Sequence, residues 1–285
     1  MDKTYTLNNT FSFSRFGKYF QYDCRRWVAG YGPTLLLMSA FPVILYTMTL
    51  VYSLLFRQEW GTPGETTRII VACIMTGILM LTYPSQVYGF VTDKRAGSAF
   101  LMIPASVFEK FLSMILNTAL VVPLAFGSVY LALDAVICAV DGTCGGTLFS
   151  SLVDGLKVLA SFAFSSDAPV KVSMFSMCMN AMLGCLYFLL GALLFRKHKI
   201  LYPILILVGF NMVVSMIFGL VLTMGVLDMD ALSEWMEHFV MRYVEDPDFI
   251  RWAVPVYNAA ATLWDLILTG GLMAAVYFRI RTLKH

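Results

Sequence analysis

Apolar blocks of about 20 residues recur along this chain, and they restrict its fold more than any other feature of the sequence. A helix needs about 20 predominantly apolar residues to cross roughly 30 Å of hydrocarbon. Of the 285 residues, 59% are hydrophobic and only 13% are charged, whereas a soluble domain carries about twice that charge. The sequence therefore predicts an all-α integral membrane protein, because helices satisfy their own backbone hydrogen bonds in lipid.

The apolar blocks predict six transmembrane helices, which together form one domain over residues 31–285. The expected spans are about 33–56, 68–91, 107–133, 172–195, 200–227 and 252–278. Prolines inside several spans do not contradict this prediction, since neighbouring helices can satisfy the carbonyl groups that a proline frees.

The basic residues predict the orientation of the spans. An even number of spans places both termini on one side of the membrane. With that side inside, 14 of the 20 Lys and Arg residues fall in inner segments and six in outer segments. The positive-inside rule then predicts cytoplasmic termini in a bacterial cytoplasmic (inner) membrane. The net charge of +2 is too small to indicate a nucleic-acid partner.

Residues 1–30 are expected to form a cytoplasmic segment that contains an amphipathic helix over 11–27. At 100° per residue, one stripe of this helix holds Phe13, Phe16, Phe20, Cys24 and Trp27. The opposite side holds Arg15, Lys18, Tyr22, Arg25 and Arg26. An aromatic face opposite a basic face is typical of a helix lying on an anionic leaflet, so membrane lipids are expected partners. The alternative is an ordinary helix packed on another domain's core.

The inner segment between the second and third spans combines charges with an apolar patch. Ser106 and Glu109 form an S-x-x-E capping box, which predicts that the third span begins there. Exposed apolar residues ahead of it suggest a docking surface, although they could instead sit in the lipid interface or under the bundle. The candidate docking residues are Asp93, Lys94, Arg95, Phe100, Leu101 and Met102.

Two outer segments are predicted to carry amphipathic helices. The first, at about 134–171, is periodic from Phe149 to Phe162, and the second lies at 228–251. Cys138 and Cys144 precede the first periodic stretch and could pair if they face an oxidising space. Free, apolar cysteines are the favoured interpretation.

One carboxylate, Asp265, stands near the middle of the sixth predicted span. A charge at that depth costs about 2.5–3.5 kcal/mol on insertion scales and usually faces a partner or water. Asp265 could belong to a substrate path or could be bonded to a polar residue of another span, and the second interpretation is slightly favoured. The candidate partners are Asn117, Asn180 and Asn211.

The sequence contains none of the common catalytic motifs. It lacks the phosphate-binding G-x-x-x-x-G-K-[ST], as well as H-E-x-x-H and G-x-S-x-G. The three histidines, His198, His238 and His285, are divided between the two sides of the membrane in the predicted topology. We therefore expect no enzyme activity, and no catalytic, cofactor or metal site, in this chain.

The predicted architecture and the segment Asp93–Leu112, DKRAGSAFLMIPASVFEKFL, resemble the permease subunits of type-2 ATP-binding-cassette (ABC) transporters, especially those of the Bacteroides group. Those permeases typically carry D-K-x followed by L-P-A-S-x-x-E-K-F, and here Ile103 stands in place of the usual leucine. The outer segment between spans three and four is longer than the family leads one to expect. The resemblance implies an exporter built from two permease subunits, either identical or different.

In such a transporter a separate ABC-type ATPase subunit holds ATP and Mg²⁺ and docks on the inner segment between spans two and three. Two other functions stay open on the sequence alone. One is a non-transport anchor or sensor subunit of an envelope complex. The other is a carrier driven by an ion gradient, although the chain shows no clear internal repeat.

Overall fold

A computed structural model of the chain describes residues 11–57, 62–141, 144, 146–164, 174–223 and 247–282. These residues are helical almost throughout, and no strand occurs among them. Five helical runs are long and apolar enough to cross a membrane: Phe13–Phe56, Glu65–Val87, Val107–Val140, Leu201–Leu220 and Pro255–Thr282. The predicted class, an all-helical multi-pass membrane protein, is confirmed at that level.

The first run is a bent helix. Its parts are α1 (Phe13–Ser39), α2 (Phe41–Tyr52) and a π-helical turn, η1 (Ser53–Arg57). The bend falls at Ala40, just before Pro42, which has no N–H to continue the helical hydrogen bonds. The run has 44 residues, about twice what a bilayer requires, so its N-terminal part extends beyond the hydrocarbon.

The helix predicted over 11–27 is the first part of α1, which continues through the expected boundary at residue 30 without a break. Its buried stripe recurs every four residues at Tyr19, Asp23, Trp27, Tyr31 and Leu35. This stripe packs against the protein, as the alternative interpretation of the segment required. Phe13, which was expected to face the membrane, is 82% exposed at the start of the helix.

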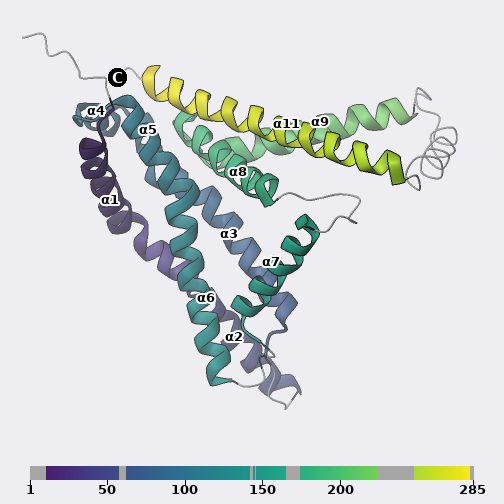
Figure 1. Cartoon of the computed structure of the whole chain (residues 1–285). Helices are drawn as coiled ribbons and strands as arrows, with labels where there is room; N and C mark the ends of the chain where they lie inside the picture. The colour runs from purple at the N-terminus through teal and green to yellow at the C-terminus, as the bar shows by residue number, and fades with distance from the viewer. Residues whose placement is uncertain are drawn as a thin grey trace, which may run out of the picture.

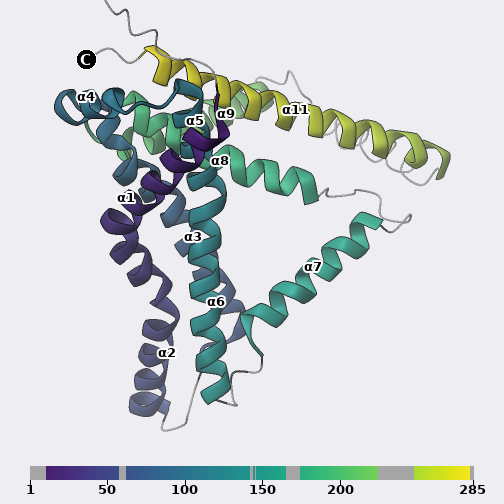
Figure 2. The ribbon, with the colours of Figure 1, turned by 60° about the vertical axis from the view of Figure 1, so that its left-hand side comes forward.

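The middle of the chain forms a second and a third long run with a short helix between them. The elements are α3 (Glu65–Val87), the 3-10 turn η2 (Gly89–Thr92), α4 (Lys94–Met102), α5 (Val107–Leu116), the π turn η3 (Asn117–Val121), α6 (Val122–Val140) and α7 (Leu148–Phe164). In Figures 1 and 2, α1–α2, α3 and α5–α6 run side by side. Helix α7 leaves the far end of α6 and runs toward the start of α8 (Met174–Leu194).

The C-terminal helices form a second set. They are α8, α9 (Leu201–Thr223) and α11 (Pro247–Thr282), and α8 packs mainly against α11 and α3. This second set begins at the end of the molecule that carries α4. From there it runs at an angle to the first set of helices, α1–α2, α3 and α5–α6 (Figures 1 and 2). Among the described residues, helices overlap each of the six predicted spans, but the apolar stretch of α8, Cys178–Leu194, is shorter than the five runs long enough to cross a membrane. Most of the predicted outer segment 228–251, namely residues 228–246, lies outside the described residues.

The largest buried core lies where the two sets meet, at the end that carries α4 and α5. Aromatic rings from α1 and α3 interlock there in edge-to-face pairs, with 5.3 Å between the ring centroids of Tyr31 and Tyr83. Leu189 of α8 and Val276 of α11 complete the core from the other set, and both are fully buried. By contrast, most of α9 exposes apolar side chains, as expected of a lipid-facing helix.

Candidate functional site

The corner between α4 and α5 is fixed by a capping box. The backbone N–H of Glu109 donates to Ser106 Oγ over 3.2 Å, and the backbone N–H of Ser106 donates to Glu109 Oε2 over 2.9 Å. Helix α4 has ended just before, and Pro104 follows within two residues of its end. The sequence prediction that a long helix begins after Ser106 is therefore confirmed.

Lys110 joins α4 to α5. Its Nζ donates to the carbonyl oxygens of Phe100 at 2.8 Å and Leu101 at 3.4 Å, and it lies 4.8 Å from the centroid of the Phe100 ring. A cation at these last carbonyls satisfies groups that the end of a helix leaves without intrahelical partners. Lys110 and Phe100 are both buried, so this contact is shielded from water.

The candidate docking residues differ in accessibility. Phe100 was expected to be an exposed anchor, and this is wrong, because its ring is only 1% exposed and lies on the buried side of α4. Leu101 and Met102 are 39% and 82% exposed at the end of α4, and Arg95 is also exposed. The Asp93 carboxylate accepts from Lys199 Nζ at 3.1 Å. The side chain of Lys94 lies outside the described part of the structure.

Lys199 ties the connection between α8 and α9 to the start of α4. Besides Asp93, its Nζ donates to the carbonyl oxygen of Gly89 at 2.6 Å. A Cβ on Gly89 would lie 2.8 Å from Lys199 Cδ, so a larger residue there would require the Lys199 side chain to shift. Two connecting segments that are far apart in sequence therefore meet beside α4.

A charged contact links the N-terminus of α1 to the same corner. Arg15 donates through Nε to Glu109 Oε2 at 2.8 Å and through Nη2 to Oε1 at 2.8 Å. Glu109 is fully buried and also accepts from the backbone N–H of Ser12 at 3.0 Å. A fork of this kind is a strong, directional contact. Sequence analysis placed Arg15 on the basic side of the predicted surface helix and did not identify this contact.

Asp23 connects three helical runs inside the core. Its Oδ2 accepts from Tyr88 at 3.0 Å, Ser113 at 2.8 Å and Asn117 at 3.0 Å, and its Oδ1 lies 2.9 Å from Arg26 Nη2. Asn117 also begins the π turn η3, and such turns often mark functional positions. The proposed pairing of Asn117 with Asp265 is thus wrong, since Asn117 is bound to Asp23.

Of the two other candidate partners of Asp265, one lies beside it and one does not. Asn180 Nδ2 donates to Asp265 Oδ2 at 3.4 Å, a long contact between α8 and α11, and Asp265 is 8% exposed. Asn211 donates to the carbonyl oxygen of Leu207 in its own helix at 2.8 Å, so it is not the partner of Asp265. Of the three asparagines considered, only Asn180 lies beside Asp265.

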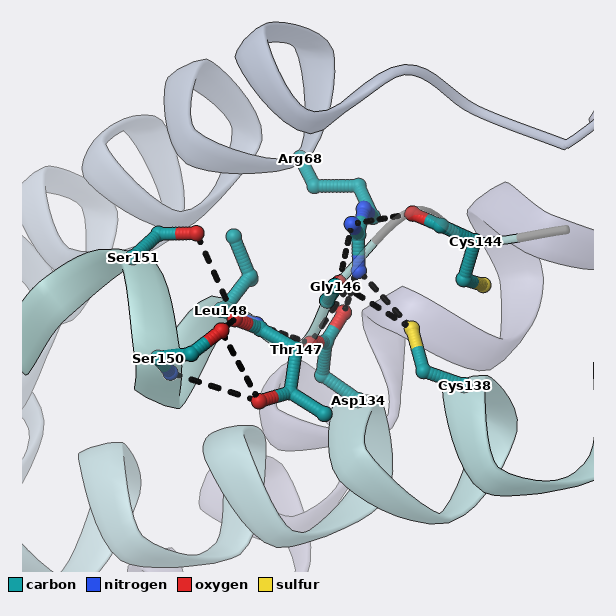
Figure 3. Close-up of polar contacts among 9 residues, drawn as sticks. All are labelled: Arg68, Asp134, Cys138, Cys144, Gly146, Thr147, Leu148, Ser150 and Ser151. Carbon is teal, nitrogen blue, oxygen red and sulfur yellow. Dashed lines mark hydrogen bonds and ion pairs between the residues drawn. The ribbon is translucent and has the colours of Figure 1, made fainter. Parts of the chain in front are cut away.

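A buried ion pair that sequence analysis did not identify joins the first turn of α3 to the C-terminal half of α6. Arg68 Nη1 lies 3.0 Å from Asp134 Oδ1, and the two side chains are 5% and 3% exposed. Figure 3 shows that Arg68 also points toward the segment that follows α6. Its Nη2 donates to the carbonyl oxygens of Cys144 at 3.1 Å and Gly146 at 2.7 Å. Asp134 in turn accepts from the backbone N–H of Leu148 at 2.8 Å, which fixes the start of α7.

A signal for this pair does exist in the sequence. Arg68 begins the second predicted span and Asp134 directly follows the third, so both lie at the outer end of adjacent antiparallel spans. Opposite charges at one level can meet across two such helices, as they do here. The two cysteines beside the pair, Cys138 and Cys144, are both free thiols.

Among the described residues, no group of three or more His, Cys, Asp or Glu side chains could hold a metal ion. An apolar cavity of about 580 Å³ lies between α3, α6 and α7, and Thr76 and Ser151 supply the hydroxyl groups in its lining. No protein-family model, no curated protein and no solved structure matches this chain. Function is therefore inferred from the residues described above.

Proposed function

We propose that this chain is the membrane-spanning subunit of an ABC exporter and that a separate ATPase subunit drives it. In this proposal the chain crosses the inner membrane six times, with both termini in the cytoplasm, and two such subunits form the transporter. The ATPase docks on α4 and transmits its movement to the helices behind it. The resemblance of Asp93–Leu112 to type-2 permeases supports the proposed family. The contacts at the α4–α5 corner support the proposed docking of the ATPase on α4.

The observation that carries the proposal is the rigid attachment of α4 to a long apolar helix. Lys110 fastens the last turn of α4 from inside, while Met102 and Leu101 stay exposed on the outside. An exposed apolar end beside Arg95 offers the combination of apolar centre and charged rim that protein interfaces use. A force applied to α4 would therefore reach α5 without first deforming a loop.

The same corner is connected to the other helices. Glu109 binds Arg15 of α1, and Lys199 binds Asp93 from the connection between α8 and α9. These contacts join the first run and the C-terminal set to the place where the ATPase would act. A membrane anchor has no need for such connections, and this favours a transport subunit over an anchor. A contiguous set of contacts is a route for coupling, and demonstrating coupling requires the experiment below.

The test is purification of the full chain with the ATPase encoded beside it. Met102→Asp places a charge in the proposed apolar contact and should reduce the co-purified ATPase at least about tenfold, the change expected for a loss of 1.4 kcal/mol. Met102→Leu is the matched control and should retain the ATPase. Full recovery of ATPase with coupled hydrolysis in the Asp variant would show that α4 is not the docking site. If the unaltered chain recovers no ATPase, the anchor, sensor or carrier alternatives would replace the proposal.

A further inference from the structure

Cys138 and Cys144 lie next to each other at the end of α6. The guanidinium of Arg68 contacts both residues, although five residues separate them in the sequence. Cys138 is half-buried and Cys144 is buried, and both are free. Figure 3 shows the Cys138 sulfur and the Cys144 carbonyl oxygen both directed toward the Arg68 guanidinium. Both residues are contacted by this one group and line the same small pocket, so they are neighbours in the fold.

Arg68 contacts both cysteines. Its Nη1 lies 3.0 Å from Cys138 Sγ, and its Nη2 binds the carbonyl oxygens of Cys144 and Gly146. The guanidinium is itself fixed by the buried Asp134 carboxylate. The two cysteines are thus positioned by a rigid group, whereas an incidental pair in a loose loop would lack such a support.

We propose that Cys138 and Cys144 are a disulfide-forming pair, oxidised by a disulfide-bearing compound or protein on the outer side of the membrane. The outer location follows from the distribution of basic residues, which places the end of α6 outside. Such compartments support disulfides, whereas the cytoplasm keeps thiols reduced. The proposal concerns a covalent modification, and it does not depend on the ATPase.

The chemistry is thiol–disulfide exchange. The Cys138 thiolate attacks one sulfur of the donor disulfide, whose S–S bond breaks and whose other sulfur leaves as a thiol after taking up a proton. Cys144 then attacks the Cys138 sulfur of the mixed disulfide and releases the second donor thiol. Overall the protein loses two electrons and two protons, and the donor disulfide is reduced to two thiols.

The surroundings of the two thiols indicate which of them reacts first. Burial raises the pKa of the Cys144 thiol, so this group stays protonated near neutral pH. Cys138 is more accessible and receives a hydrogen bond from a guanidinium, the setting in which reactive cysteines are found. Cys138 is therefore the attacking thiol and Cys144 the resolving thiol.

The test counts the thiols that reduction releases from the full chain in intact bacterial membranes. Free thiols are first blocked with N-ethylmaleimide, and the protein is then reduced and treated with a polyethylene-glycol maleimide that shifts the gel band once per thiol. The unaltered chain should gain two shifts. Cys138→Ser and Cys144→Ser should each gain none, whereas the control Cys73→Ser should still gain two.

Two further measurements use only the unaltered chain, so their results do not depend on whether the serine variants fold. In cells that cannot form disulfides outside the cytoplasm, the unaltered chain should gain no shift. The purified chain, equilibrated with mixtures of oxidised and reduced glutathione, should show one two-electron transition and a mass loss of two hydrogens on the peptide that contains both cysteines. No released thiol in the unaltered chain, or two shifts that persist in Cys138→Ser, would overturn the proposal.

Discussion

The ammonium group of Lys110 lies 2.8 Å from the carbonyl oxygen of Phe100, inside the corner between α4 and α5. The two residues are ten positions apart, yet each is almost completely buried by the other and by the core behind them. The contact places a cation at the C-terminal end of α4, where the carbonyl groups carry partial negative charge. Helix α4 is therefore held as a rigid extension of the long helical run α5–α6.

Replacing Lys110 by Met should loosen the last turn of α4. The change removes a charge-assisted hydrogen bond and leaves buried carbonyl groups without a donor, at a cost of about 1–3 kcal/mol. Amide hydrogens of residues 97–102 should then exchange roughly tenfold faster or more, as measured by mass spectrometry. Lys157→Met is the control, since Lys157 forms an exposed pair with Asp154, and it should leave α4 unchanged. Unchanged exchange in Lys110→Met would contradict the proposed attachment.

Truncating Glu109 to Ala should destabilise the protein. The change leaves the Arg15 fork and the backbone N–H groups of Ser12 and Ser106 without their acceptor. The Arg15 side chain is 29% exposed, so the expected cost is that of leaving the N–H groups of Ser12 and Ser106 without an acceptor, about 1–3 kcal/mol. Unfolding by denaturant in detergent micelles would measure this loss, and Asp154→Ala, in an exposed pair, should cost less than about 1 kcal/mol. Similar losses in the two variants would argue against a structural role for Glu109.

The Arg68–Asp134 pair should show strong coupling in a double-mutant cycle. Arg68→Met should cost about 3–5 kcal/mol, because it leaves the Asp134 carboxylate buried without its cation. Adding Asp134→Asn removes that charge but keeps an oxygen for the backbone N–H of Leu148. The double variant should therefore be more stable than Arg68→Met alone, by thermal unfolding in micelles. A further loss on adding Asp134→Asn would refute this account of the site.

Asp265 should tolerate conversion to an amide better than conversion to a hydrocarbon. It lies buried beside Asn180, and Asp265→Asn keeps a side-chain oxygen that can accept from Asn180. Asp265→Leu leaves the Asn180 amide without this acceptor and should cost about 1–3 kcal/mol more. The comparison is made by thermal unfolding and by activity of the complex. If the Leu variant equals the unaltered chain in both, Asp265 has neither a structural nor a transport role.

The proposed topology predicts different labelling of two exposed positions in a cysteine-free background. Ser150, after the outer end of α6, should react as Cys with a membrane-impermeant maleimide in intact cells. Ala99, on α4, should react as Cys only after the membrane is opened. Both side chains are exposed, so the labelling depends on which side of the membrane each position faces and not on burial. The reverse pattern would invert the whole topology, and with it the proposed site of disulfide formation.

The sequence by itself determined the class of this protein and the start of its third run. Membrane-length apolar blocks and the Ser106–Glu109 cap are local patterns, and a local pattern needs no tertiary contact to be recognised. The expectation for Phe100 failed for the same reason. Its apolar character was visible in the sequence, but whether the ring faces water or the protein depends on how α4 rotates against α5.

Only the tertiary structure decided which polar residues meet. Asn117 and Asn180 have similar surroundings in the sequence, yet one binds Asp23 and the other lies beside Asp265. Arg15 and Arg68 likewise found carboxylate partners 94 and 66 positions away. A side chain's partner depends on its depth along the helix and on the helix's rotation, and the packing of whole helices fixes both. The hydrophobic length of each helix is a property of its own residues, whereas the pairing of charges between helices is a property of the assembled fold.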